Sequence, residues 1–318
     1  MNWKDLASTS RLEDMLSAID LVEKWQEVTY VTALLENPDE FYLEKDRIAT
    51  LLVDNHLGKI ARKVRMLGQG PDGVTSDQFL NQWAEISFII SLWKRFDSLS
   101  EGLKLNLIYQ SGPNITRRHL KTLKGFRDQF LVLGRRFQME EQLLQRSVYV
   151  YGMKHERFYL VLDYSFNRQP FDFQFHLGEL YEGEAVLYPF PGSLRLSFRT
   201  TSRVKGIPGM YDRIQAVTVE KAVTEFYEAL KINPFCDPYP VIMNLKTDYV
   251  QEKWMALSPE GKPIRVSEMD ERSADVFRAA GFRRPTRMLV LMESGGVRPL
   301  SFYNGEEFLD FGVFTGNE

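Results

Sequence analysis

Cysteine is almost absent from this sequence, because Cys236 is the only one among 318 residues. A single thiol excludes a disulfide within one chain and any metal site built from several cysteines. Cys236 lies in the loop NPFCDPYP, and no histidine lies nearby in the sequence to activate it. We therefore interpret it as a structural residue rather than a nucleophile.

Long apolar segments and an excess of charge of one sign are also missing. No stretch approaches the roughly 18–20 uninterrupted apolar residues of a membrane-spanning helix. The N-terminal MNWKDLASTSRLEDML lacks the apolar core of a signal peptide, so we expect a cytoplasmic protein without membrane contact. Forty basic and 43 acidic residues give a net charge of −3. Nucleic-acid binding would therefore depend on local basic patches.

Recognisable catalytic motifs are missing as well. The sequence contains no G-x-S-x-G elbow, no Walker A loop and no S-x-x-K stretch. Two adjacent glutamates, Glu140 and Glu141, fall at a predicted hairpin tip and do not form a glycosidase pair. The histidines show no paired metal-ligand spacing; they are His56, His119, His155 and His176.

One glycine-rich stretch has the letters of a nucleotide-binding motif. GQGPDG at 68–73 matches G-x-G-x-x-G, but a predicted helix precedes it and Pro71 interrupts it. The dinucleotide fingerprint requires a strand before the first glycine, so we interpret this stretch as a loop between helices. We therefore expect no catalytic residue, no cofactor and no metal, and we favour a binding role over an enzymatic one.

Apolar residues recur at helical spacing through residues 10–111. A helix with one apolar face is predicted by each of RLEDMLSAIDLVEKW, the segment 40–67 and SLSEGLKLNLIYQ. In 40–67 that face starts at Leu43. SDQFLNQWAEISFIISLWKRF has the clearest pattern, with Ser76 or Asp77 as its cap. Its apolar positions are Phe79, Trp83, Ile86, Ile90 and Trp93. We predict a helical bundle.

The period changes from helical to alternating after residue 127. About five strands follow up to residue 204, with a turn at Pro191-Gly192. The alternation predicts an antiparallel meander with one buried and one partly wet face. In ERFYLVLDYSF, Phe158 and Leu160 face one way, whereas Tyr159 and Asp163 face the other.

The last hundred residues mix helices and strands. Two helices are predicted here, TVEKAVTEFYEALKI with Thr218 as its cap and DERSADVFRAAG with its end at Gly281. Two hairpin turns are predicted at Pro-Glu-Gly-Lys and at Ser-Gly-Gly. The fold class is therefore α+β, a helical bundle followed by an antiparallel β-sheet region with a few helices. We predict three regions, a helical domain at 1–112, a β-meander at 113–216 and an α+β region at 217–318, with the main boundary near 112–127.

Two basic runs are candidates for binding. KIARKVR covers residues 59–65, and ITRRHLKTLKGFR contains basic residues spaced to share one side of a helix. Such patches could track a phosphate backbone, meet an acidic protein or be solvated helix faces. The candidate residues are Arg117, Arg118, Lys121 and Lys124, followed by Arg135 and Arg136.

A second candidate site lies on the predicted sheet. Asp163 occupies the middle of a strand and could bond Arg146 or Arg195 across the sheet. Together with Tyr188, these residues mark where a dispersed site on the wet face would lie, but we favour a buried cross-strand network as their explanation.

Several segments resemble, in the same order, the C-terminal region of bacterial SWIM zinc-finger-family proteins. The segments that carry the resemblance are LLVDNHLGKIARKVR (51–65), DQFLVLGRRFQMEEQLLQRSVYVYG (128–152), ERFYLVLDYSF (156–166), GEAVLYPFPGSLRL (183–196) and WMALSPEGKPI (254–264). That family's zinc module is C-x-C followed by C-x-H, which a chain with one cysteine cannot build. Zinc binding is therefore not carried over.

The resemblance implies a genomic association with MoxR-type AAA ATPases and von Willebrand-A-domain proteins. It favours a non-catalytic interaction or adaptor protein whose partner is one of these. The alternatives are a nucleic-acid-associated accessory protein that uses the basic runs, and an enzyme with a dispersed site on the sheet.

Overall fold

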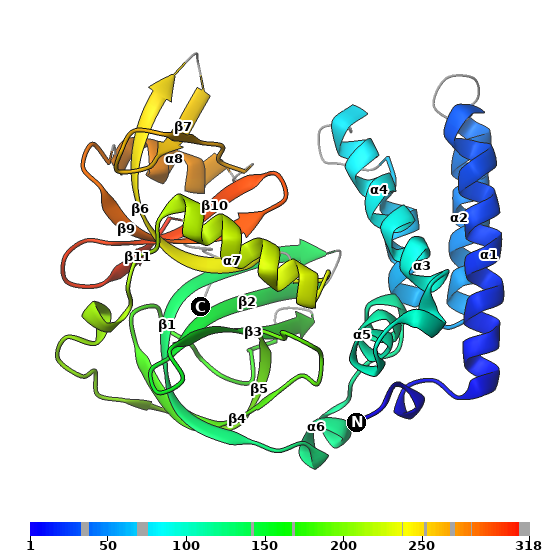
Figure 1. Cartoon of the computed structure of the whole chain (residues 1–318), viewed down its shortest axis with the longest axis horizontal. Helices are drawn as coiled ribbons and strands as arrows, with labels where there is room; N and C mark the ends of the chain where they lie inside the picture. The colour runs from blue at the N-terminus through cyan, green and yellow to red at the C-terminus, as the bar shows by residue number, and fades with distance from the viewer. Residues whose placement is uncertain are drawn as a thin grey trace. The chain divides into compact units, whose positions relative to one another are not determined.

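Residue contacts in the computed structural model divide the chain into two compact units (Figure 1), each of which we describe by itself. The helical unit comprises Met1–Thr122 with Pro189–Pro191, and the sheet unit comprises Leu123–Tyr188 with Gly192–Glu318. Residues 113–122, which we predicted as part of the β-meander, belong to the helical unit. The predicted α+β region at 217–318 does not form a unit of its own but shares the sheet unit with the strands of the predicted meander. The structure describes residues 1–32, 38–68, 76–140, 143–166, 169–236, 238–250, 253–267, 271–280 and 282–311.

The helical unit contains the helices predicted for the first third of the chain. The five apolar positions predicted for α4 are all buried, as are Met15, Ile19 and Val22 of α1. Ser100 caps α5, since its hydroxyl accepts from the Leu103 N–H. The helices are α1 (Thr9–Thr32), α2 (Pro38–Asp54), α3 (Gly58–Met66), α4 (Ser76–Trp93), α5 (Glu101–Ser111) and α6 (Arg117–Thr122), with 3-10 turns at Trp3–Asp5 and Phe96–Ser98.

The helix predicted over 40–67 is broken in the middle. α2 ends at Asp54 and α3 begins at Gly58, because His56 adopts a left-handed backbone with φ of 64°. The Leu57 N–H then donates to the Leu52 carbonyl at 2.8 Å and ends α2. Leu43, predicted on the apolar face, is 76% exposed. The GQGPDG loop lies outside the described residues from position 69 onward.

Five strands of the sheet unit form a closed barrel rather than the predicted open meander. β1 pairs with β2 along its second half and with β4 along its first half, so its length closes the sheet on itself. β3 and β5 are paired in parallel, at Leu160 and Val161. The strands are β1 (Phe126–Glu140), β2 (Leu143–Gly152), β3 (Arg157–Phe166), β4 (Leu180–Leu187) and β5 (Arg195–Val204).

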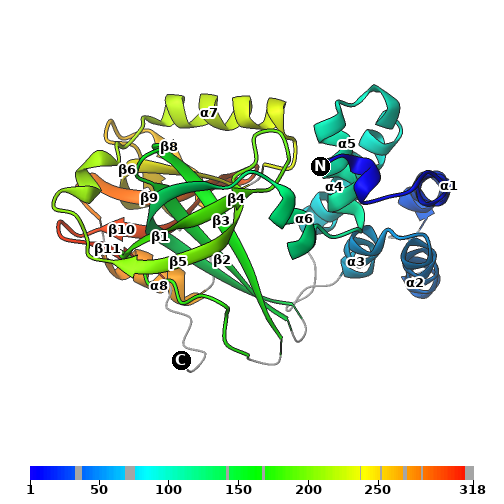
Figure 2. The same ribbon diagram turned by 90° about the horizontal axis from the view of Figure 1, so that it is seen from below.

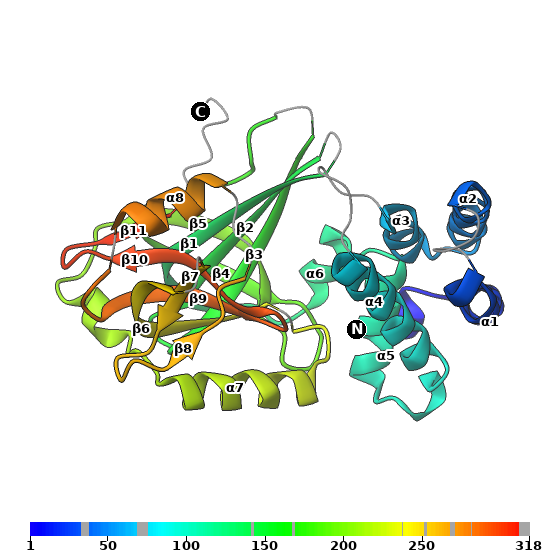
Figure 3. The ribbon, with the colours of Figure 1, turned by 90° about the horizontal axis from the view of Figure 1, so that it is seen from above.

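This strand order, β1-β2-β3-β5-β4 with one parallel pair, is that of five-stranded Greek-key barrels such as the OB barrel. A bulge between Val132 and Gly134 bends β1. Beyond the bulge, β1 and β2 extend away from the barrel together with the end of β3, as a long ribbon (Figures 2 and 3). Glu140, predicted at the hairpin tip, pairs with Leu143 at the ribbon's end, and Glu141 lies outside the described residues.

The predicted alternation along β3 is confirmed, but its consequence differs. Tyr159 and Val161 pack inside the barrel, whereas Phe158 and Leu160 pack against a second sheet. Near the start of β3 both faces are therefore covered. The face of Tyr159 and Asp163, which was expected to be wet, is turned toward the barrel interior, and exposure begins only toward the strand's end on the opposite face, where Phe166 is 52% exposed.

The second sheet has six strands in the order β11-β10-β9-β6-β7-β8. One face packs on the barrel, where Gly134 leaves no room for a side chain because an added Cβ would lie 2.5 Å from Cδ2 of Leu289. Helices α7 and α8 cover the other face through Phe226 and Phe277. The elements are β6 (Tyr239–Val250), β7 (Lys253–Leu257), β8 (Pro263–Ile264), β9 (Thr286–Glu293), β10 (Gly296–Tyr303), β11 (Phe308–Asp310), α7 (Val219–Ile232) and α8 (Glu271–Ala280), with a 3-10 turn at Met210–Arg213.

Local signals in this region are confirmed. The Thr218 hydroxyl accepts from the Lys221 N–H and caps α7. The hairpin β7–β8 turns at Pro259–Lys262, and β9 pairs with β10 up to Glu293 and Gly296. Gly281, predicted as the end of α8, lies outside the described residues.

Candidate functional site

Arg146 and Asp163 are direct cross-strand partners of β2 and β3. Nη2 of Arg146 donates to Oδ2 of Asp163 at 2.6 Å and to the Phe173 carbonyl at 2.5 Å. The guanidinium also lies 4.0 Å above the Phe171 ring. The predicted bond between these two residues is confirmed. Arg146 is only 3% exposed, so the pair is not on a wet sheet face.

The loop between β3 and β4 carries alternating phenylalanines in FDFQF (171–175), which we call the aromatic segment. Phe173 and Phe175 pack into the barrel core beside Phe198. Burial lowers the pKa of Arg146, and the Asp163 carboxylate opposes that effect. Through its bond to the Phe173 carbonyl and its contact with the Phe171 ring, the buried Arg146 side chain holds the aromatic segment against β2 and β3.

Tyr188 and Arg195 form a separate pair. The Arg195 guanidinium stacks 4.2 Å from the Tyr188 ring, and the Tyr188 N–H donates to the Arg195 carbonyl at 2.9 Å. Leu196 points into the barrel, so alternation places Arg195 on the outer side of the wall, opposite to Arg146. The four residues grouped by the sequence therefore form two pairs on opposite sides of the wall.

The predicted basic helix ends early, because α6 stops at Thr122. Arg117, Arg118 and Lys121 belong to the helical unit, whereas Lys124 follows the helix and lies in the sheet unit. The prediction that Lys124 shares a helix side with Arg117 is therefore wrong. Leu123-Lys124-Gly125 leads directly into β1 instead of continuing α6.

Arg135 and Arg136 of β1 form ion pairs with acidic residues of the second sheet. Nη2 of Arg135 lies 2.8 Å from Oδ2 of Asp310, and Nη1 of Arg136 lies 3.6 Å from Oε1 of Glu293. Burial lowers the pKa of Arg136, and the nearby Arg298 lowers it further. These charges join the barrel to the second sheet.

Two lysines of the second basic run, 59–65, also make contacts within the helical unit. Nζ of Lys59 donates to the Tyr109 carbonyl, and Lys63 pairs with Glu85 of α4. These contacts hold α3 against its neighbours in the helical unit.

The outer face of β2 and β3, which binds oligonucleotides in OB barrels, is largely covered here. Tyr149 and Tyr151 of β2 and Phe158 and Leu160 of β3 form a common core with residues of the second sheet. An oligonucleotide could not lie on this part of the barrel without displacing that sheet.

A carboxylate–imidazole pair was missed by sequence reasoning. Asp128, whose side chain is completely buried, lies 2.6 Å from Nδ1 of His155 in the turn after β2. Its oxygens also accept from the N–H groups of Gln129, Lys154 and His155. Gly152 permits this approach, since a Cβ there would lie 2.7 Å from Oδ2 of Asp128. No signal in the sequence joins residues 27 positions apart.

Three backbone donors on one carboxylate identify Asp128 as the anchor of the 153–156 turn. The His155 side chain is 38% exposed and stacks edge-on against Phe126. Within the described residues, no three His, Cys, Asp or Glu side chains gather closely enough to hold a metal. Cys236 is buried.

Tyr159, beside this pair, gives a testable pH dependence. Burial raises the pKa of the Tyr159 phenol from 10.0 to about 12; Arg157 opposes the shift and Asp128 adds to it. Because the folded pKa exceeds the unfolded one, this contribution to stability is present below pH 10 and is lost as pH rises toward 12. We expect Tyr159→Phe to lose less stability than the wild type between pH 9 and 11.

Urea unfolding of both proteins at the two pH values measures this difference. Other buried tyrosines, such as Tyr181 and Tyr239, whose pKa values are also raised, are common to both proteins and cancel. Parallel pH profiles for the two proteins would contradict the assignment.

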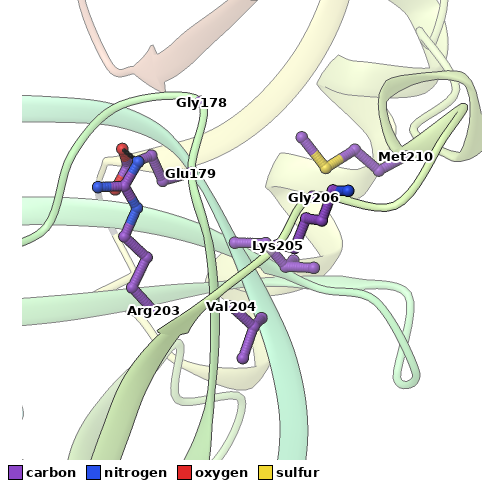
Figure 4. A pocket seen from close by; sticks show the side chains of 8 residues that line it. Gly178, Glu179, Arg203, Val204, Lys205, Gly206 and Met210 are labelled. Atoms are coloured by element: carbon purple, nitrogen blue, oxygen red, sulfur yellow. Dashed lines mark ion pairs between the residues drawn. The ribbon is translucent and has the colours of Figure 1, made fainter.

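A pocket of about 530 Å³ lies where the start of β4 approaches the end of β5 (Figure 4). The sequence did not predict it, because three separate segments line it. Its residues are Gly178, Glu179, Leu180, Arg203, Val204, Lys205, Gly206 and Met210. A second pocket of about 380 Å³ adjoins it and shares Gly206 and Met210.

Comparisons with known proteins give no relative for this chain: no family model, no curated protein and no solved structure matches it. The SWIM-family resemblance therefore stays a prediction. Among the helices that the structure describes, none combines the length and apolar character needed to cross a bilayer.

Proposed function

We propose that this protein is a non-catalytic adaptor whose helical unit binds a protein partner through an exposed apolar ridge on α4. The ridge consists of Leu80, Ala84 and Phe88, which recur at steps of four and therefore lie on one side of the helix. Leu80 is 43% exposed and Phe88 is 41% exposed, whereas the opposite side of α4 is buried.

The distribution of exposed apolar side chains also supports the helical unit as the one that binds a protein partner. Among residues whose side chains the structure describes, nine of the 15 exposed large hydrophobic residues belong to the helical unit, which is much the smaller of the two. Single exposed apolar residues are ordinary, but a concentration of them is typical of interaction surfaces. They are Met1, Leu21, Val28, Tyr42, Leu43, Val53, Met66, Leu80 and Phe88.

The resemblance to SWIM-family proteins supports a partner class, a MoxR-type AAA ATPase or a von Willebrand-A-domain protein. The nucleic-acid alternative draws less support, because Arg135 and Arg136 are paired with Asp310 and Glu293. The enzyme alternative loses its proposed site, since the structure separates Arg146 and Asp163 from Tyr188 and Arg195.

Affinity capture of the full chain from its native organism, followed by binding measurements with the purified partner, tests the proposal. We expect Leu80→Gln with Phe88→Gln to weaken binding about tenfold or more, because large apolar anchors dominate interface energies. Glutamine keeps helix propensity, so the circular dichroism spectrum stays that of the wild type.

Asn81→Ala with Ser91→Ala is the matched control, since both residues are exposed on the same helix. This control variant keeps the wild-type affinity. A chain recovered without a reproducible partner, or a partner bound equally by both double variants, would contradict the proposal.

A further inference from the structure

The pocket at the start of β4 has the composition of a small-molecule site. We infer that it binds a small molecule with one anionic group on an apolar body, independently of the proposed protein contact. Its volume of about 530 Å³ lies in the range of ligand pockets. All residues that line the pocket belong to the sheet unit, so the site is complete within that unit.

The apolar part of the pocket comes from side chains at the edge of the barrel–sheet core. Leu180 and Met210 belong to that core, and Val204 packs against it. Gly206 keeps the space open, since an added Cβ would lie 3.3 Å from Cε of Met210. An apolar ligand body would thus extend an existing core and leave water.

The charges in the pocket decide the sign of the ligand. Glu179 and Arg203 form an ion pair on one side of the pocket (Figure 4), so these two charges neutralise each other. Lys205 makes no hydrogen bond or ion pair within the described part of the chain. Its ammonium group lies on the other side, toward Met210 (Figure 4). The uncommitted charge of the pocket is therefore positive.

The adjoining pocket sets the orientation of the ligand. Asp212 and Glu306 line it together with Tyr211 and Tyr303. Because the Lys205 ammonium group lies toward Met210, which both pockets share, the anionic end binds at this shared edge. The apolar body then extends away from the two carboxylates, over Leu180 and Val204.

Hexanoate is a suitable probe, and hexan-1-ol has the same apolar body without the charge. Saturation-transfer NMR with the full chain gives a dissociation constant for each. We expect hexanoate to bind with a constant on the order of 1 mM. Hexan-1-ol binds about twofold to fivefold more weakly, the range for a partly exposed charge contact.

Three variants separate this site from others. Lys205→Met lowers hexanoate affinity to that of hexan-1-ol, and Gly206→Leu, which fills the pocket, abolishes binding of both. Lys231→Met removes a lysine that is 70% exposed on α7 and leaves both affinities unchanged.

Three results would each overturn the inference. They are the absence of saturable transfer to hexanoate up to about 20 mM, hexanoate affinity unchanged in Lys205→Met, and binding retained in Gly206→Leu. None of these outcomes depends on a protein partner, so the adaptor proposal can fail or succeed separately.

Discussion

Replacing Arg146 with alanine is expected to lower the free energy of unfolding by about 3–5 kcal/mol, the range for breaking a buried ion pair from one side. The substitution leaves the Asp163 carboxylate without its cation at 2.6 Å and the Phe173 carbonyl without its donor. It also removes the stack on Phe171. Because these contacts fasten the aromatic segment, the barrel end it fills is expected to loosen.

Urea unfolding followed by amide hydrogen exchange in the barrel strands measures the loss in the sheet unit. Arg127→Ala on β1 is the matched control, since Arg127 is exposed and its loss is expected to change stability by no more than about 0.5 kcal/mol. An Arg146→Ala protein within about 1 kcal/mol of the wild type would show that the pair does not fasten the segment.

The Arg146–Asp163 contact could be predicted because neighbouring strands of a hairpin set their own register. β2 and β3 follow each other along the chain with a short turn, so alternation alone places the two residues opposite each other. The sequence favours a buried cross-strand network for these residues, but it does not indicate what covers the pair. That depends on the aromatic segment, whose phenylalanines fill the barrel end from a loop without regular structure.

Barrel closure was missed for a similar reason. It rests on pairing between Phe126–Leu131 of β1 and Leu180–Ala185 of β4, and on two residue pairs between β3 and β5. These contacts join distant segments, whereas periodicity reports only which side of a strand is apolar. The same limit explains why the Asp128–His155 pair and the pocket beside Lys205 could not be found in advance.

Helix positions were easier, because helical spacing and caps are local properties. α4 begins at Ser76, α7 begins directly after its predicted cap Thr218, and the apolar side of α4 is buried as its spacing indicates. The break at His56 was not predictable from spacing, since the apolar period continues across it. It depends on α5, whose end at Gly112 approaches the turn from elsewhere in the sequence.

Among the glycines that the structure describes in the helical unit, Gly112 is expected to be the least replaceable. A Cβ at this position would lie 1.9 Å from the His56 carbonyl oxygen and 3.2 Å from Cα of Leu57. Both are backbone atoms held by the Leu57-to-Leu52 hydrogen bond, so no side chain can move aside. We expect Gly112→Ala to cost about 3 kcal/mol or more, at the upper end for overpacking.

Gly58→Ala is the matched control, because it also replaces glycine with alanine but at a position with room for the methyl group. No atom lies within 4 Å of an added Cβ at Gly58, which begins α3. Alanine there is expected to stabilise the unit by about 0.5 kcal/mol, because it restricts the unfolded chain without strain. Ellipticity at 222 nm follows the helical unit, since α1–α6 belong to it. If both variants melted together, α5 would not approach the His56 turn, and the break between α2 and α3 would need another cause.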